Sequence, residues 1–206
     1  MPGAVTHLKA AYLYNSMHND FTGEELSLYY LGSISPDAVN LKGHAEKKIR
    51  WSSHLRNSDL DLWLENVRSY YSENKLNYPI PYLQGYLIHI ITDIVWDKYF
   101  EIPLFNEFDK YGIKNEEKKH QRWQELDFYE NEQRLLPWYD EVKRLLERSF
   151  ALKICSVSAE EINSFKNMVI NRGFVENTAF GIVDEHLINR CCCIVFALAD
   201  DIFGLN

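Results

Sequence analysis

The sequence lacks several features that would assign it to a class of protein at once. No two cysteines have the Cys-x-x-Cys spacing of a structural zinc site, because three of the four are consecutive at 191–193. Adjacent helical positions point about 100° apart, so these three cannot chelate one ion together. We therefore expect the cysteines to be small buried side chains in a reducing environment.

Long apolar runs and targeting signals are also missing. No stretch reaches the roughly 18 uninterrupted apolar residues that a membrane-spanning helix needs. The first residues contain neither a basic region nor a continuous apolar segment of the kind found in signal peptides. These absences predict a protein that has no transmembrane segment and is cytoplasmic.

Positive charge is scarce. The chain of 206 residues has 22 lysines and arginines against 30 acidic residues, a net charge of −8 with the two signs interleaved. This balance argues against double-stranded nucleic acid as a partner, because that partner favours a basic stripe. Small anionic substrates stay open, because bound metal ions can reverse the local field.

Period-two alternation, the signature of strands, is absent as well, so we predict an all-α fold with one domain over residues 1–206. The helices are expected at 5–18, 22–31, 58–74, 80–101, 115–148, 159–171 and 175–202. Pro103 is expected to end the fourth helix and Pro137 to split the fifth. The long connection 32–57 is expected to carry function.

Two of these helices have a sequence that predicts a capping box at their first turn. The motifs are Thr22-Gly-Glu-Glu25 and Ser158-Ala-Glu-Glu161. In each, a hydroxyl side chain would accept from the backbone three residues on, where a glutamate would reach back.

The predicted helix 80–101 poses the central question. It is apolar nearly all round, yet His89 and Asp93 share one face, one turn apart. A buried carboxylate needs a partner, which could be a metal ion or simply a hydrogen bond within the helix. On the same face, Gly85 would allow another backbone or a ligand to approach closely.

Other residues could join this pair. His7 lies on the first predicted helix, Asp37 follows Ser35-Pro36, and His54 lies near the end of the long connection. Each one alone is weak, because a loop histidine is commonly solvated and an aspartate after proline is an ordinary turn residue.

Taken in order, these motifs resemble the zinc-dependent phospholipase C family. The matching segments are Met-Pro-Gly-Ala-Val-Thr-His at 1–7, Leu-Gly-Ser-Ile-Ser-Pro-Asp at 31–37, Ser-His-Leu at 53–55 and Gly-Tyr-Leu-Ile-His-Ile-Ile-Thr-Asp at 85–93. The resemblance covers roughly the first 100 residues well and the rest loosely. It implies an all-α multi-helix bundle with zinc ions at the bottom of a cleft, and an enzyme that cleaves phosphodiester bonds.

The resemblance also implies a ligand set. Asp37, His54, His89 and Asp93 would bind one ion, and His7 would bind a second that Asp93 bridges. Secreted members use their mature N-terminus as a further ligand, which this chain, without a signal, is not expected to supply. They also have a later His-x-x-x-Glu pair, but none follows Asp93 here.

The nearest substitute for that late pair is His120 with Asp127, two turns apart on one helix. Asp127 lies among apolar neighbours and His120 follows a charged run, so we predict Asp127 as the site residue and His120 as a surface residue. One to three zinc ions are expected, with manganese or iron as alternatives for such mixed ligands.

The predicted function is a metal-dependent phosphoric ester hydrolase in which a metal-activated water attacks phosphorus. Asp37 is the predicted catalytic residue, a general base that orients this water. The expected substrate is a small-molecule or lipid phosphoester. Tyr82, Tyr86 and Trp96 are expected in the core rather than along a cleft.

Three alternatives compete. An HD-type phosphohydrolase needs a His-Asp dipeptide, and no histidine here precedes an aspartate. A di-iron carboxylate protein needs two Glu-x-x-His motifs, and only Glu117–His120 fits. A non-catalytic protein that keeps the fold, with a structural metal or none, stays open. His44 and His186 match no motif and are expected in a loop and on a helix surface.

Overall fold

The computed structural model describes residues 2–41, 43 and 45–205, so His44 lies outside the described residues. The predicted all-α class is confirmed over these residues, which contain no strand and one isolated bridge between Ile154 and Val157. The α-helices are α1 (Ala4–His18), α2 (Gly23–Gly32), α3 (Lys47–Ser53), α4 (Leu60–Asn74), α5 (Ile80–Val95), α6 (Glu101–Asp109), α7 (Lys118–Gln133), α8 (Pro137–Arg148), α9 (Ala159–Asn171) and α10 (Glu185–Phe203). A 3-10 helix, η1 (Ser35–Asn40), and a π-helical turn, η2 (Trp96–Phe100), complete the set.

Several predicted boundaries agree with the structure to within two residues. The helices expected at 5–18, 58–74 and 159–171 correspond to α1, α4 and α9. Pro137 does split the fifth predicted helix, and it begins α8, where a missing N–H costs nothing. Ser158 forms the predicted capping box with Glu161.

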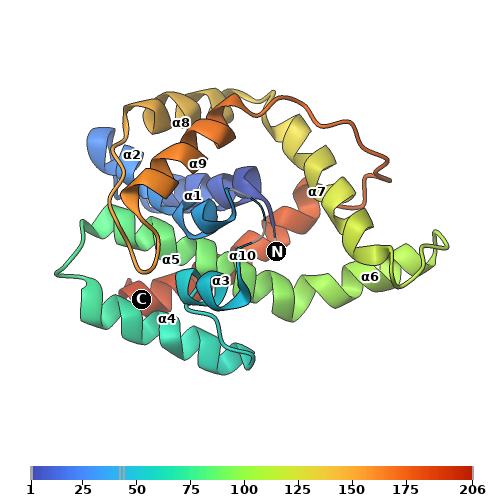
Figure 1. Cartoon of the computed structure of the whole chain (residues 1–206), viewed down its shortest axis with the longest axis horizontal. Helices are drawn as coiled ribbons and strands as arrows, with labels where there is room; N and C mark the ends of the chain where they lie inside the picture. The colour runs from blue at the N-terminus through green and yellow to red at the C-terminus, as the bar shows by residue number, and fades with distance from the viewer. Residues whose placement is uncertain (1, 42, 44, 206) are drawn as a thin grey trace.

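The prediction that Pro103 ends a helix was wrong. Helix α5 passes through η2 into α6, so that Figure 1 shows α5 and α6 as one nearly continuous rod. Pro103 is the third residue of α6, among the first-turn positions whose N–H groups need no partner in their own helix. The π-helical turn just before it resets the hydrogen-bonding pattern, so the proline is tolerated.

The capping box at Thr22 was also predicted wrongly. The Thr22 side chain makes no capping hydrogen bond. The chain enters α2 through Gly23, whose φ of 55° is left-handed rather than helical, so the turn that a capping box needs is not formed.

The last helix begins at Glu185 rather than at the predicted 175. Residues 172–184 instead cross the molecule as an extended segment from α9 to α10 (Figure 1). Their backbone bonds to α7: the N–H groups of Phe180 and Ile182 each donate to the Glu125 carboxylate over 2.7 Å. These tertiary contacts replace the helical bonds that the local sequence favours.

Helix α5 is the central element. It contacts α1, α2, α4 and α10, which surround it in Figure 1. Its crossing with α2 is very close, because a Cβ atom at Gly85 would collide with the carbonyl of Tyr29, and one at Gly32 with the carbonyl of Tyr82. Gly85 therefore serves the approach of another backbone, one of the two roles considered for it.

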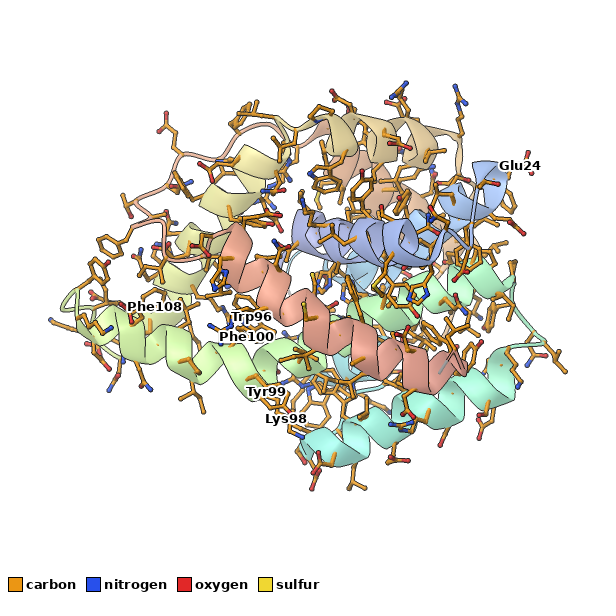
Figure 2. The ribbon with its side chains drawn as sticks, turned by 180° about the vertical axis from the view of Figure 1, so that it is seen from behind. Glu24, Trp96, Lys98, Tyr99, Phe100 and Phe108 are labelled. Carbon is orange, nitrogen blue, oxygen red and sulfur yellow. The ribbon has the colours of Figure 1, made fainter. Side chains whose placement is uncertain are left out.

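Aromatic residues fill the core around α5. Tyr82, Tyr86 and Trp96 are fully buried there, as predicted. Figure 2, from the opposite side, shows Trp96 and Phe100 at the junction of α5 and α6. The expectation for the cysteines was half right: Cys191 and Cys192 are buried, but Cys193 is exposed and Cys155 is partly exposed.

The predicted connection 32–57 is more ordered than expected, because it contains η1 and α3. No helix in the described part of the chain has the length and apolarity to cross a bilayer.

Candidate metal centre

The carboxylate of Asp93 is the most unusual group in the core. Its side chain is completely buried on α5, and neither oxygen has a hydrogen-bond partner. A carboxylate without donors in an apolar interior costs several kcal/mol. Three histidines surround it, and each presents an Nε2 atom that also lacks a hydrogen-bond partner: His7, His54 and His89.

His89 is oriented by the tight crossing of α2 and α5. Its Nδ1 atom donates to the Ser33 carbonyl over 2.8 Å, at the end of α2. This bond places the remaining proton on Nδ1 and leaves the Nε2 lone pair facing Asp93 Oδ2, 3.7 Å away. A hydrogen bond between His89 and Asp93 within the helix, which was the alternative to a metal ion, is not formed.

His54 is held at the end of α3 in the same way. Its Nδ1 atom lies 2.9 Å from the Arg50 carbonyl, and its own carbonyl accepts from Trp63 Nε1 over 2.7 Å. Tyr86, on α5, donates to the carbonyl of Ser53. His54 Nε2 is thereby fixed 3.3 Å from Asp37 Oδ1 and 3.6 Å from Asp93 Oδ2.

Asp37 comes from η1, immediately after Pro36. Its Oδ2 atom lies 4.0 Å from His89 Nε2, and its side chain is 18% exposed. The long connection thus supplies two residues of the cluster, Asp37 and His54.

His7 completes the cluster from α1. Its ring stacks on His89 with centroids 3.6 Å apart, and its Nε2 atom lies 3.5 Å from Asp93 Oδ1. The two oxygens of Asp93 therefore face different histidines, Oδ1 toward His7 and Oδ2 toward His54 and His89.

These distances fit metal coordination better than hydrogen bonding. Two overlapping groups, His7–His89–Asp93 and Asp37–His54–His89, each bring their ligand atoms within 4.8 Å of one another. Zinc with ligands at 2.0–2.1 Å would separate neighbouring ligand atoms by about 3.4 Å in a tetrahedron. The observed 3.3–3.7 Å separations around Asp93 and between His54 and Asp37 lie close to that value. The residues present could therefore hold a metal ion.

The electrostatics of the cluster also favour a cation. Burial raises the pKa of Asp93 to about 7 and lowers the pKa of His89 to about 4. Burial also lowers the pKa of His7 well below its ordinary value. For Asp37, burial is outweighed by His54 and His89, which lower its pKa, while Asp37 and Asp93 raise the pKa of His54 against the effect of burial.

A cleft of about 570 Å³ opens onto this cluster, and Asp37 and His54 form part of its lining. Seven basic and three acidic side chains line the cleft, although the whole chain has a net charge of −8. The basic ones are Lys47, Arg50, Arg56, Lys119, Arg122, Arg134 and Arg172. The cleft thus has the opposite sign to the protein, a feature that total charge did not reveal.

Helix α7 forms one wall of this cleft, but the structure does not bring the predicted site residue Asp127 to the cluster. Asp127 Oδ1 instead accepts from Arg172 over 2.8 Å. His120 is exposed, as predicted, and so is His186. The α7 carboxylate nearest the start of α1 is Glu130, which accepts from the N–H and the hydroxyl of Thr6 at 3.1 and 3.0 Å.

Sequence reasoning missed Glu130 and the basic lining. Glu130 is three residues from Asp127 and has no motif around it. The arginines come from segments far apart in the chain, and no spacing rule joins them.

Comparison with protein-family models, curated proteins and solved structures gives no match.

Proposed function

We propose that the protein is a metal-dependent phosphoric ester hydrolase that uses zinc, as the order of its motifs suggested. The observation that carries the proposal is the buried Asp93 carboxylate, which has no donor and faces the Nε2 atoms of three histidines. Mixed imidazole and carboxylate ligands suit zinc, and also manganese or iron.

Asp37, His54, His89 and the Oδ2 atom of Asp93 would hold one ion, and His7 with Oδ1 would contribute to a second. When bound, such ions polarise phosphoryl oxygens and lower the pKa of water. The backbone acceptors of Ser33 and Arg50 keep His89 and His54 turned toward the ion.

The remaining steps fall to side chains that reach the cleft. Asp37 is partly exposed, and its lowered pKa keeps it ionised, so its carboxylate can accept a hydrogen bond from a water molecule and orient it. The basic lining attracts a phosphoester and neutralises charge that develops on its oxygens. A positive cleft in an acidic protein suits an anionic substrate.

The test uses protein purified without a metal-binding tag. We expect elemental analysis to find at least one transition metal per chain, and bis(p-nitrophenyl) phosphate to be hydrolysed. Chelation should abolish this hydrolysis, and added zinc should restore it. Protein with no metal above background, even after growth in supplemented medium, would contradict the proposal.

One outcome favours the main alternative. Stoichiometric metal without hydrolysis of any phosphoester would identify a structural-metal protein that keeps the fold. The ion pair between Asp127 and Arg172 favours this alternative, because it leaves the expected late ligand, Asp127, outside the cluster.

A further inference from the structure

Three arginines around the cleft have incomplete hydrogen bonding. The Nε atoms of Arg50, Arg122 and Arg134 are buried and have no acceptor. All three residues line the same cleft. A buried guanidinium N–H without an acceptor costs free energy, so groups of this kind collected in one place indicate a ligand that completes them.

Arg122 and Arg134 both belong to the α7 wall. The Arg122 side chain is 10% exposed and donates through Nη1 to Glu101 over 2.6 Å. The Arg134 side chain is 8% exposed, and its nearest carboxylate oxygen, on Glu130, is 3.9 Å away. Neither neighbour satisfies the Nε atom, so each arginine keeps one donor without an acceptor.

The arrangement is extended rather than focused on one point. Arg134 comes twelve positions after Arg122, which is about 18 Å along a helix at 1.5 Å per residue. Arg50 lies on α3, and its carbonyl orients His54. One phosphoryl group at the cluster could not reach both ends of such a wall.

We propose that the substrate is a small soluble phosphoester that carries a second phosphate group, an inference that rests on the proposed hydrolase function. One phosphate would lie at the cluster beside Asp37 and His54. The second would be bound by guanidinium groups of the α7 wall, which match phosphate oxygens in a fork geometry.

The charge of the cleft disfavours a zwitterionic lipid headgroup. Its ammonium group would be placed among seven basic and three acidic side chains, an excess of positive charge that repels it. A second phosphate is attracted by the same field. The proposed substrate therefore differs from a diester with a neutral tail in two ways: it carries more negative charge, and it has a second, free phosphate group.

The binding test uses pairs of ligands that differ by one phosphate. Propane-, hexane- and decanediol bisphosphates are compared by calorimetry with propyl, hexyl and decyl phosphate on the metal-loaded protein. We expect at least one bisphosphate to bind about tenfold or more tightly than its partner, as charge-assisted bonds imply. Equal affinities in every pair would overturn the proposal.

Variants locate the second phosphate. Arg122→Gln and Arg134→Gln should each reduce the bisphosphate advantage, because each should weaken the binding of a bisphosphate more than the binding of the alkyl phosphate of the same length. Arg144→Gln is the matched control, because it removes the same charge from a residue that is exposed on α8 and does not line the cleft. If all three variants behave alike, only the net charge matters and the proposed site is wrong.

Arg122 pairs with Glu101, so melting temperatures are measured first; Arg134→Gln carries the test if Arg122→Gln does not fold. Vesicles of phosphatidylcholine with phosphatidic acid form a further arm, and a preference for them over every bisphosphate would refute a soluble substrate.

Hydrolysis of bis(p-nitrophenyl) phosphate is followed in parallel. Hydrolysis without a bisphosphate advantage refutes this inference alone, whereas an arginine-dependent advantage without hydrolysis refutes the proposed function alone.

Discussion

The buried carboxylates of α5 and α7 form an instructive contrast. Glu125 and Asp93 are both completely buried. Glu125 accepts from the N–H groups of Phe180 and Ile182 and from Gln121, whereas Asp93 accepts from nothing. The two carboxylates are therefore equally buried, but only Glu125 has hydrogen-bond donors around it.

This difference separates a structural role from a candidate functional one. On α7, the carboxylates hold neighbouring segments: Glu125 fixes the extended chain before α10, Glu130 holds the first turn of α1, and Asp127 pairs with Arg172. On α5, the partner that Asp93 needs is not supplied by the described residues. An acid that is buried and unsatisfied is the stronger sign of a metal site.

The largest expected effect comes from breaking this contrast directly. Asp93→Asn should weaken zinc binding by more than about 100-fold, because changes to the outer partners of ligands alone cost 10- to 100-fold. Asp127→Asn should leave zinc binding unchanged, since its partner Arg172 is not a ligand. Competition with a chromogenic chelator measures both affinities.

The paired result is decisive for the sequence-based assignment. Loss of zinc from the Asp127 variant would show that α7 does supply a ligand, as the resemblance suggested. If the Asp93 variant bound zinc as tightly as the wild type, His89 and Asp93 would be core residues and not metal ligands.

A second effect, of intermediate size, is the pH dependence of zinc binding. In the metal-free protein, burial raises the pKa of Asp93 to about 7, and nearby carboxylates raise the pKa of His54. Zinc requires both groups to be deprotonated, so it displaces protons as the pH falls. Affinity should drop by about tenfold or more per pH unit below 7 and level off above the two pKa values.

His7 and His89 do not add to this slope near neutrality, because burial lowers their pKa values and they are already neutral. Calorimetry in buffers with different ionisation enthalpies counts the protons released. Affinity that is flat between about pH 6 and about pH 8 would contradict the proposed participation of Asp93 and His54.

The sequence predicted the core of this site where local geometry decides it. His89 and Asp93 share a face because four residues make about one helical turn, whatever the rest of the chain does. Gly85 also indicated that another backbone or a ligand comes close to the helix, and the structure shows that this is the backbone of α2. For Asp37 and His54 the resemblance was needed, because their meeting depends on how η1 and α3 pack.

The failures come from tertiary contacts that no local pattern encodes. Residues 175–184 read as helix, but Glu125 captures their backbone N–H groups. Pro103 reads as a terminator, but a π-helical turn accommodates it. The basic cleft joins α3 and α7, which are distant in sequence, so the net charge of the chain concealed it.

The smallest expected effect concerns Glu130, the α7 carboxylate that is buried and yet partly satisfied. Burial raises its pKa, and Arg134 and Thr6 only partly offset this. The folded protein therefore binds a proton more tightly than the unfolded chain, whose glutamate has a pKa of about 4.3. The sign follows from linkage: stability from this group is fully present below about pH 4.3 and is lost as the pH rises through the folded pKa.

Glu130→Gln tests this sign. The amide oxygen can still accept both bonds from Thr6, so the variant should fold and differ from wild type by about 1 kcal/mol or less at neutral pH. It cannot titrate, so wild type should lose stability relative to it by up to about 1.4 kcal/mol per pH unit between the two pKa values. Urea unfolding of chelated samples at several pH values measures this difference. A gap that instead widens in favour of wild type as the pH rises would mean that Arg134 stabilises an ionised Glu130, and the contrast with Asp93 would then be one of charge partners rather than of hydrogen-bond donors.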